Sequence, residues 1–160
     1  MGPAVTTSGR GSTSRRAVIL YDADCGFCRW SLAKILGWDR AGGLQAVALQ
    51  DPEAERLLGA MSEEERMGSW HLVTAAGEAR SAGAAFVPLF ELLPGGRALA
   101  SLARRFPEPT ERAYEAVSRH RGRLGRLIPQ SAVRRADGRI RERSRAIPEL
   151  PGEASGAPGA

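Results

Sequence analysis

The order of apolar and polar residues predicts a strand, a helix and a second strand in the first third of the chain. Continuous apolar runs, typical of buried strands, occupy residues 16–21 (RAVILY) and 44–50 (LQAVALQ). Between them, a helical pattern extends from Phe27 to the loop at 39–43. Its apolar stripe consists of Cys28, Leu32, Ile35 and Leu36. These elements predict a βαβ unit.

Helix-start signals follow the second strand. Asp51 and Pro52 provide an N-cap acceptor and a proline in the first turn, so a helix should continue through 53–61. Ser62 and Glu65 have the spacing of a capping box, which predicts another short helical turn. Short helices should therefore connect the βαβ unit to the rest of the fold.

A hairpin and covering helices are predicted next. The runs at 69–74 and 79–81 read as two strands joined by a bend at Gly77. Residues 82–93 are apolar on nearly every side, which favours a buried helix that Pro88 kinks or delays. Two further helices are expected at 97–106 and 110–122.

Periodicity is lost beyond Pro129, which sets the predicted boundary of the folded part. Residues 130–160 are rich in arginine and then in Pro, Gly and Ala, so we expect a disordered tail. Residues 1–16 should form a disordered arm. The remaining residues, 17–129, should form one α/β domain, a sandwich in which helices flank a mixed β-sheet, with extra C-terminal helices.

Composition indicates a globular protein with a core of its own. Apolar residues make up 42% of the chain and charged residues 26%, which is ordinary for such proteins. No apolar run approaches the roughly 18 residues that a membrane span requires, and the first residues lack the apolar segment of a secretory signal. We therefore expect no membrane span and a cytoplasmic location.

Positive charge is concentrated near the C-terminal end. Residues 97–145 contain 14 arginines against five acidic residues, a net charge of +9, whereas the whole chain carries +5. A basic segment of this kind is typical of a surface that binds an acidic partner or nucleic acid. However, the chain has 22 arginines and a single lysine, which points to GC-rich coding bias rather than to selection for phosphate binding. Phe106 and Tyr114 are also the only aromatic residues in this segment on which bases could stack. Nucleic acid is not an expected partner, and a non-catalytic binding module remains an alternative function.

The two cysteines, Cys25 and Cys28, lie where the first strand gives way to the first helix. A thiol attacks as the thiolate, and the unpaired N–H groups and the dipole of a helix N-terminus stabilise that charge. A separation of three residues places both sulfurs on one helix face, close enough to bond. The pair therefore predicts a redox dithiol, in which Cys25 attacks and Cys28 resolves the mixed disulfide.

A metal-binding cysteine pair is the competing interpretation. A structural zinc site needs four Cys or His ligands at characteristic spacing. The only histidines, His71 and His120, are far from the cysteines and from each other in the sequence. We expect His71 to be hydrogen-bonded in a strand and His120 to be solvated. No metal site is therefore expected within one chain, although a site shared between two copies stays open.

Two carboxylates and three aromatic residues flank the dithiol. One of the two acids, Asp24 in preference to Asp22, is a candidate N-cap of the helix. The alternative role is acid–base chemistry, with Asp22, at the end of a buried strand, as the proton acceptor for Cys28, and the sequence favours neither role over the other. Both carboxylates should disfavour a thiolate at Cys25, which opposes the helix terminus. The aromatic residues are typical of a core, or of an apolar rim that binds the substrate: Tyr21, Phe27 and Trp30.

The sequence LYDADCGFC at 20–28 resembles the signature of the DCC family of thiol-disulfide oxidoreductases, typically Tyr-Asp-Gly-Asp-Cys-x-x-Cys. The likeness continues to Pro129 and so covers about 17–129. The resemblance implies a thioredoxin-like fold and protein-disulfide oxidoreductase activity. It also implies that Cys25 and Cys28 form the redox pair, with Asp22 and Asp24 as signature acids.

Departures from the expected pattern concern the substrate site. Ala23 stands where the family usually has Gly, and His120 stands where Asn is common. Thioredoxin-fold enzymes generally place a cis-proline before the strand that faces the dithiol, whereas this position reads GSWHL (68–72) here. The resemblance thus predicts the thiol–disulfide chemistry of the cysteine pair but not the substrate groove that is usual in thioredoxin-fold enzymes.

The expected function is reversible dithiol–disulfide exchange. Its substrate would be a disulfide or thiol, carried by a protein or by a small molecule. No cofactor is expected, and electrons would return from a cellular reductant.

Overall fold

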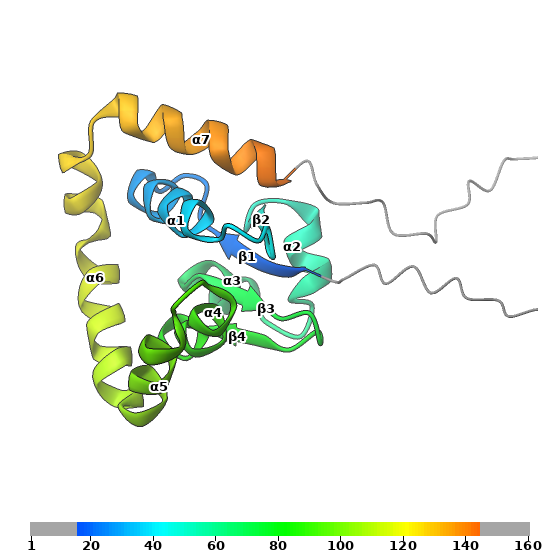
Figure 1. The fold of residues 1–160 in the computed structure, drawn as a ribbon. Coiled ribbons are helices and arrows are strands. Elements are labelled where there is room, and N and C mark those ends of the chain that lie inside the picture. Colours follow the sequence, from blue (N-terminus) through cyan, green and yellow to red (C-terminus); the bar gives the residue numbers. More distant parts are fainter. Residues whose placement is uncertain (1–15, 145–160) are drawn as a thin grey trace, which may run out of the picture.

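One mixed sheet in the order β2-β1-β3-β4 forms the middle of the fold, in a computed structural model that describes residues 16–144 (Figure 1). β1 (Ala17–Tyr21) pairs in parallel with β2 (Leu44–Ala48). β3 (His71–Val73) runs antiparallel to both β1 and β4 (Ala79–Ser81). Because β1 is paired along both edges, the turn that follows it starts from the interior of the sheet.

Helices cover both faces of the sheet (Figure 1). α1 (Gly26–Trp38) joins β1 to β2 and completes the predicted βαβ unit, and α2 (Pro52–Leu57) and α3 (Glu63–Gly68) lead to β3. A 3-10 turn, η1 (Ala82–Ala85), then precedes four α-helices: α4 (Phe86–Leu92), α5 (Arg97–Arg105), α6 (Pro107–Leu127) and α7 (Gln130–Ser144). Within 16–144, no helix has the length and apolar character needed to cross a membrane.

Successive residues of the sheet supply two hydrophobic cores, one on each face. The first core lies under α1, α4 and α7 and includes Ile19, Leu36, Leu72, Leu89 and Ile140. The second core lies under α2 and includes Leu20, Val47, Leu58 and Val73. A βαβ unit followed by an antiparallel hairpin, with helices on both faces, is a thioredoxin-like α/β fold, which confirms the predicted fold class.

α6 runs along one side of the molecule, from η1 to the beginning of α1 (Figure 1). Gly83 allows this close approach at one end, because its N–H donates to Glu111 Oε2 at 2.9 Å and a Cβ there would lie 2.8 Å from Glu111 Cα. At the other end, a Cβ on Gly125 would lie 3.5 Å from the backbone N of Phe27. α6 therefore reaches the junction where the two cysteines lie.

α7 corrects the expectation that residues 130–160 are disordered. Residues 130–144 form a helix that packs along α1 and reaches β2. Its apolar stripe is Val133, Ala136 and Ile140, each no more than 5% exposed. The sequence interpretation missed this stripe because only three apolar residues keep helical spacing among the arginines. The rest of the predicted tail and nearly all of the predicted arm at 1–16 lie outside the described residues.

Arginines of α7 also bind the C-terminal end of α1. Arg143 donates to the carbonyl oxygens of Leu36 and Asp39, at 3.3 and 2.8 Å, and to the Asp39 carboxylate at 3.2 Å. This carboxylate is 1% exposed and also accepts the backbone N–H groups of Gly43 and Leu44, at 3.1 and 2.9 Å. A cation at the end of a helix satisfies its free carbonyls and complements its dipole.

Element boundaries differ from the prediction where prolines lie. The apolar segment 82–93 is divided into η1 and α4, and Pro88 lies in the first turn of α4, where its missing N–H leaves no helical bond unmade. α6 begins at Pro107 instead of residue 110, because proline is well suited to the first helical turn.

His71 is a buried, hydrogen-bonded residue, as expected. It is 1% exposed, and its Nε2 lies 2.8 Å from the Arg66 carbonyl oxygen, so Nε2 carries the proton. Nδ1 lies 2.6 Å from Ser81 Oγ and accepts from that hydroxyl. Burial lowers the pKa of His71 below its ordinary value, and the bond to the Arg66 carbonyl partly opposes this shift.

We expect this histidine to make the protein less stable as the pH falls. Below its ordinary pKa of about 6.5, the unfolded chain gains a proton that the folded His71 does not take up until the pH reaches its lowered pKa. The free energy of unfolding should therefore fall as the pH decreases through this window. Urea unfolding at several pH values, with His71→Gln for comparison, measures the effect. An equal pH slope in both proteins would contradict it.

Candidate active site

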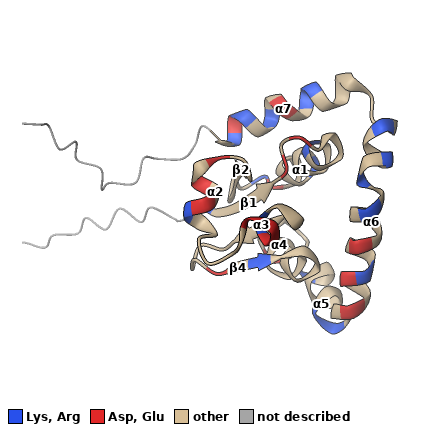
Figure 2. Cartoon of the chain, turned by 180° about the vertical axis from the view of Figure 1, so that it is seen from behind, with Lys and Arg blue, Asp and Glu red and all other residues tan. Residues whose placement is uncertain are grey.

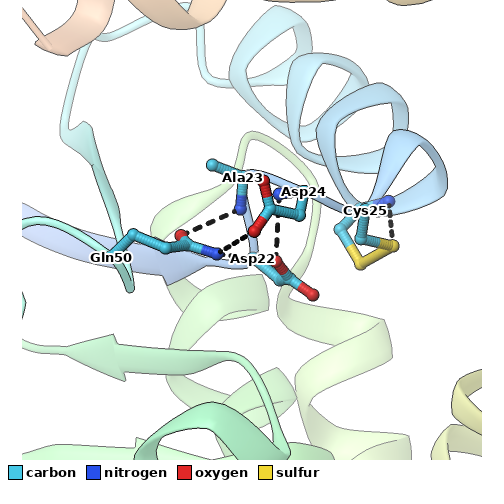
Figure 3. Close-up of a disulfide and its surroundings, with 6 residues drawn as sticks. Asp22, Ala23, Asp24, Cys25 and Gln50 are labelled. Carbon is cyan, nitrogen blue, oxygen red and sulfur yellow. Dashed lines mark hydrogen bonds between the residues drawn. A yellow bond between two sulfur atoms is a disulfide. The ribbon is translucent and has the colours of Figure 1, made fainter.

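A disulfide joins Cys25 and Cys28 at the N-terminus of α1 (Figure 3). Their Cα atoms are 5.2 Å apart, and Cys25 is the N-cap residue of the helix, in an extended backbone conformation. The backbone N–H of Cys28 donates to Cys25 Sγ at 3.2 Å. The structure thus places the Cys25 sulfur at the positive end of the helix dipole, on a backbone donor.

This arrangement corrects the expectation that Asp24 caps α1. Cys25 itself accepts the N–H at the first turn, and the carboxylate of Asp24 turns away to Gln50. The hydrogen bond from the Cys28 N–H should strengthen when Cys25 becomes a thiolate, because an anionic acceptor binds an N–H more strongly than a neutral one.

Gln50 holds the turn that carries the two acids (Figure 3). Its Nε2 donates to Asp22 Oδ1 at 2.9 Å and to Asp24 Oδ2 at 3.2 Å, and its Oε1 accepts the N–H of Ala23 at 3.2 Å. Asp22 Oδ1 also accepts the N–H of Asp24 at 3.0 Å. An amide just beyond β2 therefore fixes both carboxylates of the signature beside the disulfide. Gln50 was not predicted as a site residue, because the apolar run 44–50 placed it at the end of the second strand, whereas β2 ends at Ala48.

An ion pair joins the helix of the cysteines to α7. Arg29 Nη1 lies 3.0 and 3.1 Å from the two carboxylate oxygens of Asp137.

Burial raises the pKa of Tyr21 above its ordinary value, the Asp137 carboxylate adds to this shift, and Arg29 opposes it. The Tyr21 phenol therefore stays protonated at neutral pH and keeps its hydrogen-bond donor.

A cavity of about 290 Å³ opens beside the disulfide. Its walls come from α1, the end of β1, the residues before β3, α4 and α6. The lining residues are Ile19, Tyr21, Asp22, Phe27, Cys28, Ser31, Leu32, Ile35, Ser69, Trp70, Phe86, Tyr114, Val117, Ser118 and Arg121. Most of these side chains are apolar or aromatic, so the cavity suits a largely apolar group.

The cavity brings together some of the predicted site residues and leaves others outside. Tyr21, Asp22, Phe27 and Cys28 line it. Cys25 and Asp24 lie next to it in the turn. Trp30 does not line it and instead lies near Phe27, with ring centroids 6.3 Å apart, and under Lys34 Nζ at 5.5 Å.

The far wall of the cavity was not predicted. It contains an aromatic row, in which Phe86 lies 5.2 Å from Trp70 and 6.3 Å from Tyr114 between ring centroids. Trp70 lies in the segment before β3, the position of the cis-proline in thioredoxin-fold enzymes, and no cis peptide occurs in residues 16–144. Sequence patterns cannot reveal this wall, because its residues belong to three separate elements that meet only in the folded chain.

The histidines lie apart from the cysteines. Both ring nitrogens of His71 are hydrogen-bonded inside the fold, and His120 is exposed on α6 with Nδ1 2.7 Å from the Ala116 carbonyl oxygen. Across residues 16–144, no group of three or more His, Cys, Asp and Glu side chains is arranged to hold a metal ion.

One of three comparisons with known proteins gave a match, and the matched family agrees with the redox chemistry suggested by the site. No match was found among curated proteins or among solved structures. A family model described as DCC1-like thiol-disulfide oxidoreductase matches residues 19–127, which include the disulfide, the two acids and all the lining residues of the cavity. The chain therefore belongs to the DCC1-like thiol-disulfide oxidoreductase family.

Proposed function

We propose that the protein catalyses reversible dithiol–disulfide exchange through Cys25 and Cys28. One observation carries this proposal: the two cysteines form a disulfide at a helix N-terminus, and one of them borders an apolar cavity. Membership of an oxidoreductase family supports the same chemistry.

The reaction begins with the reduced pair. Cys25 is the nucleophile, because the Cys28 N–H and the α1 dipole favour its thiolate. Its sulfur attacks one sulfur of a substrate disulfide, the substrate S–S bond breaks, and the departing sulfur leaves as a thiolate that takes up a proton. Cys28 then attacks Cys25 Sγ, which closes the protein disulfide and releases the second substrate sulfur as a thiol.

Asp22 is the proposed proton acceptor for Cys28. Both residues line the cavity, and the Gln50 amide and the Asp24 N–H fix the orientation of the Asp22 carboxylate. Asp24 has a positioning role, since Gln50 bridges it to Asp22. Tyr21 and Phe27 contribute to the substrate-binding wall, and Trp30 supports Phe27 from outside the cavity.

A redox titration tests this function. The full chain is equilibrated with buffers of known thiol–disulfide ratio, its free thiols are alkylated, and the mass shift is read by mass spectrometry. We expect one two-electron couple at Cys25 and Cys28, with a potential between about −120 and −300 mV, the range of disulfide oxidoreductases. Thiols that never pair in any buffer would contradict the proposal.

A further inference from the structure

Among residues 16–144, Arg121 is the one basic side chain that lines the cavity beside the disulfide. It is half-buried on α6, and no ion pair or hydrogen bond engages its guanidinium within residues 16–144. By contrast, Arg29, Arg139 and Arg143 bind carboxylates or carbonyls of the fold. Figure 2 shows that basic residues recur along α6 and α7, but Arg121 alone among them joins the cavity wall.

Asp22, the only acid that the described part of the chain contributes to the cavity wall, already has hydrogen-bond partners. Asp22 accepts hydrogen bonds from the Gln50 amide, just beyond β2, and from the Asp24 N–H in its own turn, so both donors belong to the fold. A guanidinium that is partly removed from water gains from a carboxylate partner, which it can bind with two parallel hydrogen bonds. Arg121 therefore has the chemistry to recognise a ligand carboxylate.

The rest of the wall selects an apolar ligand of small size. The cavity volume of about 290 Å³ lies just below the range of about 300 to 1,000 Å³ that is typical of small-molecule sites. The aromatic row and the aliphatic side chains of α1 make up most of the wall. Apart from Asp22 and Arg121, the polar side chains in the wall are the hydroxyls of serines and tyrosines. A polar peptide such as glutathione would lose hydration there without replacement.

We propose that the substrate is a small apolar disulfide, or the corresponding dithiol, that ends in a carboxylate bound by Arg121. This inference rests on the proposed function, since the ligand sulfurs react with the cysteine pair. Its apolar chain occupies the cavity between α1 and the aromatic row, and its sulfurs lie at the Cys28 end. Lipoate, a five-membered cyclic disulfide on a short alkyl chain with a terminal carboxylate, is a suitable probe.

The exchange balances without any further oxidant. Cys25 and Cys28 as thiols transfer two electrons and two protons to the lipoate disulfide, whose S–S bond breaks to give two ligand thiols. The protein S–S bond forms in the same reaction, and the reverse reaction oxidises the ligand dithiol and reduces the protein disulfide.

Binding is measured first, under conditions in which no reaction occurs. Oxidised full-length protein is titrated with oxidised lipoate and, separately, with lipoamide, which has the same ring and chain but no charge. We expect lipoate to bind about tenfold more tightly than lipoamide, the gain of one charge-assisted contact. Oxidised glutathione should bind more weakly than either.

Two variants of α6 assign the effect to the cavity. Arg121→Gln should abolish the preference for lipoate over lipoamide, whereas Arg123→Gln, an exposed arginine outside the cavity, should leave it unchanged. Ser118→Trp, which places a large ring in the cavity from the surface helix, should weaken the binding of both ligands. Equal effects of the two arginine variants, or equal affinity for lipoate and lipoamide, would overturn the inference.

The reaction is then measured as the rate at which the reduced protein converts lipoate to its dithiol. If the Cys25–Cys28 couple is reversible but the reduced protein does not reduce lipoate, this substrate class is refuted and the proposal of dithiol–disulfide exchange stands. Tight binding of lipoate without a reversible couple would refute the proposed function instead.

Discussion

Replacement of Cys25 by serine is expected to reduce disulfide exchange by about a thousandfold or more, the scale seen when a nucleophile is removed. Replacement of Cys28 by serine should have a different outcome, because the attack by Cys25 is preserved and only the resolving step is lost. The Cys28→Ser protein should therefore accumulate a mixed disulfide on Cys25. Incubation with a model disulfide, followed by non-reducing mass spectrometry of peptides, measures both effects.

Each cysteine variant serves as the control for the other. The positions differ in their surroundings: Cys25 caps α1, whereas Cys28 lies one turn further on and borders the cavity. Serine is close to cysteine in size, so both variants should keep the fold, and far-UV circular dichroism checks this. Trapping on Cys28 in the Cys25→Ser protein, with none on Cys25 in the other, would reverse the assigned roles.

Replacement of Ile140 by alanine should lower the free energy of unfolding by about 3 kcal/mol, the typical cost of removing a large aliphatic side chain from a core. Ile140 is 4% exposed and belongs to the core that also contains Ile19, Leu36 and Leu89. This prediction tests whether α7 is part of the domain, although it lies beyond the matched residues 19–127. Urea unfolding with an unchanged m-value measures the effect.

Arg141→Ala is the matched control for this experiment. Arg141 is the next residue on α7 and is exposed, so its replacement should change the stability by no more than about 0.5 kcal/mol. If Ile140→Ala were as mild as Arg141→Ala, α7 would contribute little to the core. A disordered segment from residue 130 onward, as the sequence first indicated, would then be the better description.

The predictable parts of the fold are those in which apolar residues follow one period without interruption. Both parallel strands and α1 were predicted for this reason, and the Ser62–Glu65 capping box is present. α7 was missed because its stability comes from tertiary contacts. A stripe of three apolar residues is too thin a signal, and the contacts of Arg143 with the end of α1 leave no mark in the sequence.

The same distinction separates the predicted and unpredicted parts of the site. Cys25 and Cys28 are neighbours in the sequence, so spacing alone predicted their pairing and their helix terminus. The role of Asp24 as a cap was wrong, because Cys25 takes that position and Gln50 draws the carboxylate away. The cavity could not be predicted, since Trp70, Phe86 and Arg121 meet only in the folded chain.

α1 is held at both ends, with Gly125 of α6 against its first turn and Arg143 of α7 against its last. A helix restrained in this way cannot slide or unwind when its sulfur–sulfur bond opens. Rearrangement between the two redox forms should then be limited to side-chain torsions at residues 25 and 28. Opening and closing the disulfide should then need little movement of the backbone, while the reduction potentials of the two partners decide the direction of exchange.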